Sequence, residues 1–243
     1  SIVVTGGSRG IGRAIAIEFA NQNYDVLITY LTNEIAAQEV LEAINSVGVK
    51  GVALKADTCD KTSPSKIAES ALDAFGKIDV LVNNAGISPK GPNNERLNSS
   101  DTDLKTWGHV FHVNFFSSVV LVNGLKTELE EAKGSIVNVT SIAGSRVHPF
   151  AGAPYATSKA ALAALTREMA HDLGPLGIRV NAIAPGEVET SILSPGTDKI
   201  IDNLPLQRLG QPSEVASAIF FLCSGQSSYI SGTEIQVNGA QHV

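Results

Sequence analysis

Short apolar runs alternate with longer amphipathic stretches along the whole chain. The short runs are rich in β-branched residues, and several lack the period-two alternation of a strand with one exposed face. They predict strands at Ile2–Thr5, Asp25–Tyr30, Gly51–Ala56, Ile78–Asn83, Ser135–Thr140, Arg179–Ala184 and Thr233–Val237. The longer stretches predict helices at Gly10–Asn21, Glu34–Val47, Ser63–Phe75, Asp103–Leu129, Ala153–Leu173 and Ser213–Leu222.

This order of elements predicts an α/β protein, because strands that alternate with helices form a parallel sheet with crossover connections. Strands without alternation are expected to be covered on both faces. We therefore expect a Rossmann-type, doubly wound sheet of about seven parallel strands with helices on both faces. At 243 residues the chain fits one domain, residues 1–243, because α/β folds of this length are routinely single.

The composition argues against several classes of partner. A net charge of −6 does not suit a nucleic-acid-binding surface, which is normally basic. No apolar stretch approaches the roughly 20 residues that span a bilayer, and the N-terminus does not resemble a signal peptide. The chain opens inside a strand, so we expect a few natural residues ahead of Ser1. Cys59 and Cys223, the only cysteines, are expected to be reduced thiols of a cytoplasmic protein.

A glycine-rich segment, Thr5–Gly12, joins the first predicted strand to the first helix. Gly6, Gly10 and Gly12 permit a tight turn, the close approach of a pyrophosphate and close packing of helix on strand. Free N–H groups at the start of a helix bind phosphate, so this segment is a candidate dinucleotide site. Its spacing, G-x-x-x-G-x-G, departs from the general G-x-G-x-x-G fingerprint. A glycine-rich turn without a ligand is the alternative interpretation.

Tyr155 and Lys159 carry the clearest candidate chemistry. Residues four apart on one helix share a face, so the ammonium is expected beside the phenol. A neighbouring cation favours the phenolate and lowers the phenol pKa from about 10 toward neutrality, which suits a proton donor and acceptor. Ser141 lies upstream. The alternatives are a core tyrosine, a solvated lysine and a serine that merely ends a strand.

Five motifs, in this order, resemble the short-chain dehydrogenase/reductase family. They are T-G-G-S-R-G-I-G at Thr5–Gly12, Asn83-Asn84-Ala85-Gly86, Ser141, the pair Tyr155 and Lys159, and Pro185-Gly186. The similarity covers essentially the whole chain. It is closest to the β-ketoacyl-acyl-carrier-protein reductases and to their sugar, polyol and steroid relatives.

The resemblance implies reversible hydride transfer between a nicotinamide and a small-molecule carbonyl or alcohol, with a 3-oxoacyl thioester among the candidate substrates. Ser141 is implied to orient the carbonyl, and Tyr155 to donate or accept the proton. Lys159 is implied to lower the tyrosine pKa and to hold the nicotinamide ribose. Asn114 matches the family's catalytic asparagine, which supports a proton-relaying water. The alternative for Asn114 is a polar residue that bends the helix.

The same resemblance implies the cofactor-binding residues. Asp57 matches the adenine contact, and Val188 and Thr190 match the segment that reads the carboxamide. The full expected set is Gly6, Ser8, Arg9, Gly10, Ile11, Gly12, Tyr30, Thr32, Asn33, Asp57, Thr58, Asn84, Ala85, Gly86, Tyr155, Lys159, Pro185, Gly186, Val188 and Thr190.

The end of the second strand favours NADP(H) over NAD(H). Enzymes that prefer NAD place a carboxylate there to bind the ribose 2′-OH, and this chain has Tyr30 instead. Arg9 matches the family's basic residue that neutralises a 2′-phosphate, and Thr32 and Asn33 could add hydrogen bonds. A solvent-facing loop arginine is the alternative. Leu31 argues against a preference for NADP(H), because many NADP-using relatives carry a second basic residue at that position.

Other features refine the picture. The segments 87–101 and 187–207 follow strands at their carboxyl ends, and we expect the second to form a substrate loop or lid. His148 is a candidate pocket residue, with a surface loop histidine as the alternative. The histidines lack the spacing of metal ligands, so no metal is expected. The family suggests a homodimer or homotetramer. An epimerase or dehydratase, or a non-catalytic nucleotide-sensing module, is the alternative function.

Overall fold

The computed structural model describes residues 1–191, 193, 201–202 and 204–243. Its centre is a seven-stranded sheet in the order β3-β2-β1-β4-β5-β6-β7, in which all neighbouring strands are parallel. The strands are β1 (Ile2–Val4), β2 (Val26–Tyr30), β3 (Gly51–Lys55), β4 (Val80–Asn83), β5 (Ser135–Val139), β6 (Arg179–Pro185) and β7 (Glu234–Val237). The predicted doubly wound parallel sheet is confirmed.

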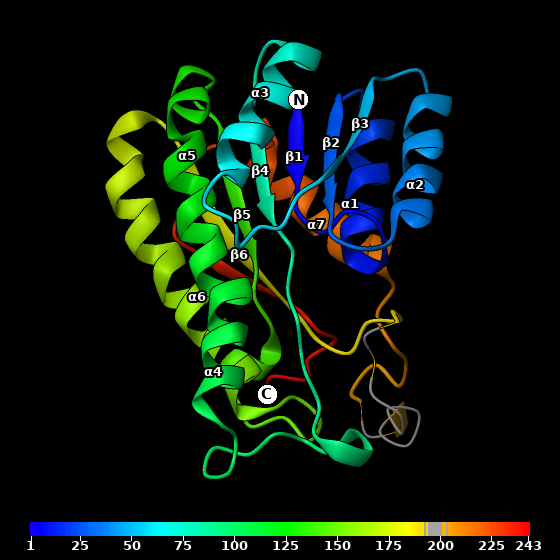
Figure 1. The fold of residues 1–243 in the computed structure, drawn as a ribbon, viewed down its shortest axis with the longest axis vertical. Coiled ribbons are helices and arrows are strands. Elements are labelled where there is room, and N and C mark those ends of the chain that lie inside the picture. The colour runs from blue at the N-terminus through cyan, green and yellow to red at the C-terminus, as the bar shows by residue number, and fades with distance from the viewer. Residues whose placement is uncertain (192, 194–200, 203) are drawn as a thin grey trace.

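Helices cover both faces of this sheet (Figure 1). One face packs against α1 (Gly10–Asn21), α2 (Glu34–Ser46) and α7 (Pro212–Cys223). The other packs against α3 (Ser63–Phe75), α5 (Ser117–Glu131) and α6 (Ala153–Leu173), with α4 (Leu104–Phe111) preceding α5. Short 3₁₀ turns lie at Pro92–Asn94, Ile142–Gly144, Gly174–Leu176 and Gly225–Ser227.

Burial on both faces explains why the strands lack period-two alternation. In β1, Ile2 and Val4 join the core cluster under α1 and α7, whereas Val3 joins the cluster under α3 and α5. Successive side chains of a strand point to opposite faces, so a strand covered twice requires an apolar residue at each position.

The predicted helix Asp103–Leu129 is not uniform. It consists of α4, a π-helical turn at His112–Phe116, and α5. Asp103 caps it, because its carboxylate accepts a hydrogen bond from the Thr106 N–H at 2.9 Å. The other element bounds agree with the sequence prediction to about two residues, as is normal for helix and strand ends.

The central strands bring two sequence motifs together at the carboxyl edge of the sheet. β1 lies between β2 and β4, which is where ligands bind in open α/β sheets. The Thr5 hydroxyl accepts hydrogen bonds from the backbone N–H groups of Asn84 and Ala85, each at 3.0 Å. The loops after β1 and β4 are thereby tied together. Among the described residues, no helix is both long and apolar enough to cross a membrane.

Candidate active site

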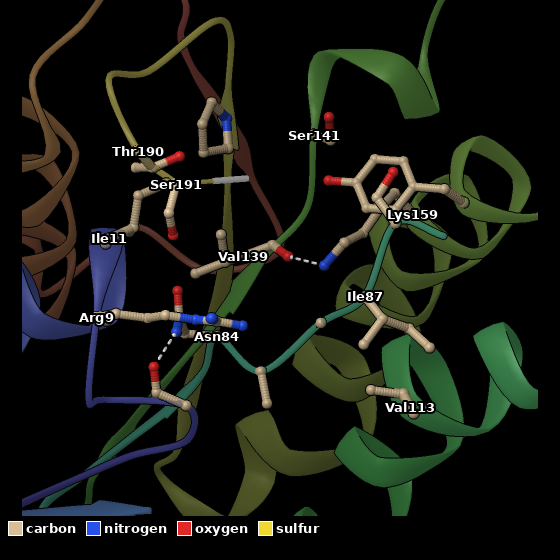
Figure 2. A pocket seen from close by; sticks show the side chains of 18 of the residues that line it. Arg9, Ile11, Asn84, Ile87, Val113, Val139, Ser141, Lys159, Thr190 and Ser191 are labelled. Carbon is tan, nitrogen blue, oxygen red and sulfur yellow. Dashed lines mark hydrogen bonds between the residues drawn. The ribbon is translucent and has the colours of Figure 1, made fainter. Parts of the chain in front are cut away.

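A cavity of about 630 Å³ lies along the carboxyl edge of the sheet. Every predicted cofactor-binding residue lines it, together with Ser141 and His148. In Figure 2, Arg9 and Ile11 lie on one side of the pocket, and Ser141 and Lys159 lie on the other. The cavity therefore joins the glycine loop to the candidate catalytic residues.

The glycine loop is shaped for close approach. Gly6 and Gly10 have φ values of +63° and +55°, which side-chain-bearing residues rarely adopt. A Cβ at Gly12 would lie 2.2 Å from the Gly6 carbonyl oxygen, so helix α1 packs on the loop only because Gly12 has no side chain. The Asn84 amide donates to the Thr5 and Gly6 carbonyls at 2.9 and 3.1 Å. This cradle, open above the N-terminus of α1, fits a pyrophosphate.

The end of β2 presents no carboxylate to the cavity. Tyr30 is 9% exposed there, and the exposed Arg9 lines the same cavity. The Asn33 side chain accepts a hydrogen bond from the Ala36 N–H at 3.0 Å, so it caps α2 as well as lining the cavity. Leu31 is 54% exposed.

The candidate catalytic residues meet where β5 and α6 face each other. Ser141 follows β5 and caps the turn Ile142–Gly144, and Tyr155 lies in the first turn of α6. Lys159 is 3% exposed, and its Nζ donates to the Val139 carbonyl at 2.6 Å (Figure 2). This Nζ lies 5.9 Å from the centre of the Tyr155 ring. The ammonium therefore faces the pocket wall and not bulk solvent.

Asn114 lies in the π-helical turn and is 1% exposed. Its Oδ1 accepts from the Ile87 N–H at 2.8 Å, and its Nδ2 donates to the Ile87 carbonyl and the Ser158 hydroxyl, each at 3.0 Å. It does not line the cavity itself, although a Cβ at Gly86 would lie within 3.4 Å of its Oδ1 and 3.5 Å of Lys159 Nζ. Asn114 thus joins the loop after β4 to α6.

The prediction that Lys159 lowers the pKa of Tyr155 is wrong for this structure. The pKa of Tyr155 is raised, mainly by burial and further by the Glu187 carboxylate, while a hydrogen bond with Ser141 opposes the rise. Burial also lowers the pKa of Lys159 to about 8. The physical reason is that burial disfavours both charged forms, and that the Lys159 ammonium is directed at Val139 instead of at the phenol oxygen.

The loop after β6 closes the far side of the cavity. A Cβ at Gly186 would lie 2.7 Å from both the Asn238 Cβ and the Gln241 Oε1, so glycine allows the loop to pack on the C-terminal turn. Val188 is buried and forms an isolated bridge with Gly210. Much of the predicted substrate loop, at positions 192, 194–200 and 203, lies outside the described residues.

Sequence reasoning missed several residues that shape the site. Val139 accepts the Lys159 hydrogen bond, Ser158 binds Asn114, and Glu187 lies beside His148. Glu187 has a readable signal, because it places a carboxylate directly after the Pro185-Gly186 motif. Within the described part of the chain, no group of three or more His, Cys, Asp and Glu side chains is arranged to hold a metal ion.

Comparisons with known proteins agree with this geometry. The family model described as enoyl-(acyl carrier protein) reductase matches residues 6–242. Protein FixR of Bradyrhizobium diazoefficiens is 48% identical over 245 residues, covering 100% of this chain and 86% of that protein. A 3-oxoacyl-[acyl-carrier-protein] reductase, FabG, of Staphylococcus epidermidis is 34% identical over 248 residues, covering 100% of this chain and 99% of that protein.

Solved structures point the same way. The crystal structure of a 3-oxoacyl-[acyl-carrier protein] reductase from Brucella melitensis with bound NAD matches with a TM-score of 0.91 and 34% identity, covering 100% of this chain and 90% of that chain. The likeness thus extends over sequence, fold and full length. The chain belongs to the short-chain dehydrogenase/reductase family of NAD(P)-dependent oxidoreductases.

Proposed function

We propose that the protein reduces a carbonyl compound by hydride transfer from NADPH, with Tyr155 as the proton donor. The placement of Lys159 carries this proposal. Its ammonium is buried beside the Tyr155 ring, and it lies in the same cavity as the glycine loop. The ammonium of a surface lysine would instead face solvent. Burying a charge is costly, so an enclosed lysine in a cleft is a candidate for function.

Each residue has a distinct task in this proposal. Ser141 orients the substrate carbonyl, and Tyr155 donates its proton as negative charge develops on the oxygen. Lys159 holds the nicotinamide ribose, and Asn114 supports the water that returns a proton to Tyr155 through Lys159. When bound, the nicotinamide supplies the hydride. The raised pKa of Tyr155 suits this direction, because the phenol keeps its proton at neutral pH.

Tyr155→Phe tests the acid assignment. We expect turnover to be nearly abolished while the dinucleotide Kd stays within about twofold, because only the hydroxyl is lost. Tyr229→Phe is the matched control, since Tyr229 is 102% exposed and does not line the cavity. A Tyr155→Phe variant that keeps more than a tenth of the wild-type kcat would contradict the proposal.

The preference for NADPH rests on the charges around the end of β2. Tyr30 leaves no carboxylate to repel a 2′-phosphate, and Arg9 supplies a cation at the cavity. The Brucella melitensis reductase, by contrast, was solved with NAD. The ratio of kcat/KM for NADPH and NADH decides the point, and a preference for NADH would overturn this part of the proposal.

A 3-oxoacyl thioester is one candidate substrate, because the Staphylococcus epidermidis relative is named for that reaction. A sugar, polyol or steroid carbonyl is the other candidate substrate, because the same active-site residues would reduce it. Following NADPH absorbance with acetoacetyl thioesters and with these ketones separates the two. Steady consumption of NADPH supports a reductase. Product formation at constant absorbance would instead indicate an epimerase or dehydratase, and dinucleotide binding without turnover a sensing module.

We also propose a cytoplasmic homodimer or homotetramer in which the segment 187–207 closes over the substrate. Exposed apolar side chains on α4 and after it support self-association: Leu104 is 87% and Phe116 is 48% exposed. Analytical ultracentrifugation tests the assembly, and a monomer at micromolar concentration contradicts it.

Limited proteolysis with and without dinucleotide tests the proposed closure of the loop, and unchanged cleavage there contradicts that closure. The free thiols of Cys59 and Cys223 suit a reducing compartment.

A further inference from the structure

A buried carboxylate faces the cavity beside Tyr155 and has no task in the proposed reaction. Glu187 is 8% exposed and lines the cavity. Its backbone is fixed at both ends, because its N–H donates to Gln241 Oε1 at 3.2 Å and its carbonyl accepts from the Gly210 N–H at 2.9 Å. The carboxylate is therefore held at the pocket wall.

The hydrogen bonding of this carboxylate is incomplete. Glu187 Oε1 lies 2.8 Å from His148 Nε2, yet the two are not aligned for a hydrogen bond. Among the described residues, Oε1 is buried without a hydrogen-bond donor. A buried carboxylate oxygen without an aligned donor is costly. A ligand that brings a donor into the cavity would remove this cost.

His148 fixes the place of the carboxylate, because its Nε2 lies 2.8 Å from Glu187 Oε1. Its Nδ1 lies 3.2 Å from the N–H groups of both Phe150 and Ala151, so Nδ1 acts as an acceptor. In a neutral imidazole the hydrogen is then on Nε2, the atom that faces Glu187. The ring orientation is thus set by the backbone, and Oε1 is left able to accept from a ligand.

The cations near this carboxylate bind other groups. Lys90 Nζ donates to the Phe150 carbonyl at 2.5 Å, and Arg96 Nε donates to the His148 carbonyl at 3.1 Å. Within the described residues, the only charge contact of Glu187 within 4 Å is with His148. The carboxylate nevertheless acts on Tyr155, since its charge adds to the raised pKa of that phenol. The substrate side of the cavity therefore carries a buried carboxylate close to Tyr155, with His148 as its nearest basic neighbour.

We propose that Glu187 is a specificity-determining residue that accepts a hydrogen bond from a hydroxyl or ammonium group close to the reacting carbonyl. The inference rests on the proposed carbonyl reduction and narrows its substrate to hydroxy- or amino-substituted ketones. A purely alkyl group at that position leaves the carboxylate unpaired, and an acidic group is repelled by it. Sites built to bind a polar substrate group reject the analogue that lacks it.

Three ketones of similar size test the proposal: propiophenone, 2-hydroxyacetophenone and 2-aminoacetophenone, which place a methyl, hydroxyl or ammonium group next to the carbonyl. For wild type we expect kcat/KM to be about 10- to 100-fold higher for the hydroxy- and aminoketones than for propiophenone, as one hydrogen bond to a charged group allows. Equal values for all three would overturn the proposal.

Two substitutions separate charge from hydrogen bonding. Glu187→Gln keeps an acceptor oxygen, so we expect it to retain the preference for the hydroxyketone and lose about tenfold of the preference for the aminoketone. Glu187→Leu should lose both preferences and reduce propiophenone better than wild type does. Glu168→Gln, at an exposed carboxylate on α6 that does not line the cavity, is the matched control and should leave all ratios unchanged. Retention of both preferences in Glu187→Leu would refute the role.

Calorimetric binding of the three ketones to the NADP⁺-loaded protein repeats the comparison without turnover. If the hydroxy- and aminoketones bind more tightly than propiophenone but none is reduced, the role of Glu187 is supported and the proposed function is contradicted. If all three ketones are reduced and bind with equal Kd values, the proposed function is supported and the role of Glu187 is contradicted. Far-UV circular dichroism and Tm of each variant show that it is folded, and Glu187→Gln, which is nearly isosteric, keeps the test open if Glu187→Leu does not fold.

Discussion

Lys159→Met removes a buried charge while keeping most of the length of the side chain. Burial lowers the pKa of Lys159 from 10.5 to about 8. This corresponds to about 3 kcal/mol by which the folded state disfavours the charged lysine at neutral pH. Losing the hydrogen bond to the Val139 carbonyl offsets about 1 kcal/mol. We therefore expect the variant to be about 2 kcal/mol more stable, or about 4–8 °C higher in Tm.

The pH dependence makes this prediction specific. Between about pH 8 and pH 10.5, the unfolded chain keeps the Lys159 proton that the folded chain has lost. Wild-type stability therefore gains a contribution from Lys159 as pH rises through this window, and the methionine variant lacks it. The stability advantage of the variant should shrink by about 2 kcal/mol between about pH 7 and pH 10.

Urea unfolding of the dinucleotide-free protein, followed by far-UV circular dichroism across this pH range, measures the difference. Lys126→Met on α5 is the matched control, because Lys126 is exposed and its replacement should change the free energy of unfolding by less than about 0.5 kcal/mol. An advantage that does not vary with pH, or a variant less stable than wild type at every pH, would refute the reasoning. Turnover should be lost in the variant, so stability and activity are opposed at this position.

Three further results are expected. Gly12→Ala should lose dinucleotide binding in a fluorescence titration, because the new Cβ would lie 2.2 Å from the Gly6 carbonyl oxygen; binding within about twofold of wild type would contradict this. Asn114→Leu should cost about 3 kcal/mol in urea unfolding, because it leaves the Ile87 N–H and carbonyl unpaired and removes the donor to the Ser158 hydroxyl, which keeps only its bond to the Tyr155 carbonyl. A loss below about 1 kcal/mol would show that the Ile87 groups find other partners. A spectroscopic titration of the dinucleotide-free protein, compared with that of Tyr155→Phe, isolates the ionisation of the Tyr155 phenol. This phenol should ionise above its ordinary pKa of 10.0, because burial and Glu187 disfavour the phenolate. Ionisation near neutral pH would contradict the structure.

Much of the site could be predicted because the topology concentrates it. Loops that follow parallel strands all lie at one edge of a sheet, so motifs as distant as Gly6 and Thr190 line one cavity. The apolar runs of β1 and β2 also predicted burial on both faces, since no position in them was left for a solvent-facing side chain. In these segments the local pattern and the tertiary structure require the same residues.

The electrostatics of the site could not be predicted from spacing. Lys159 and Tyr155 share a helix face as expected, but the Lys159 ammonium binds Val139, 20 residues away, and this partner depends on how α6 packs on β5. The rise in the pKa of Tyr155 depends on burial and on Glu187, which reaches the site from the loop after β6. A neighbour along a helix is visible in the sequence, whereas the surrounding dielectric and a charge from another loop are not.

The π-helical turn at His112–Phe116 also constrains the evolution of the chain. Such a turn amounts to one residue inserted into an α-helix, and it is retained only where another contact compensates for it. Here Asn114 links two other segments through its amide. Substitution of Asn114 alone leaves the extra residue behind, whereas deleting one residue from the turn would restore regular helix and rotate α5 relative to α4. Losing the amide while keeping the extra residue would therefore leave an irregular turn whose cost no contact offsets.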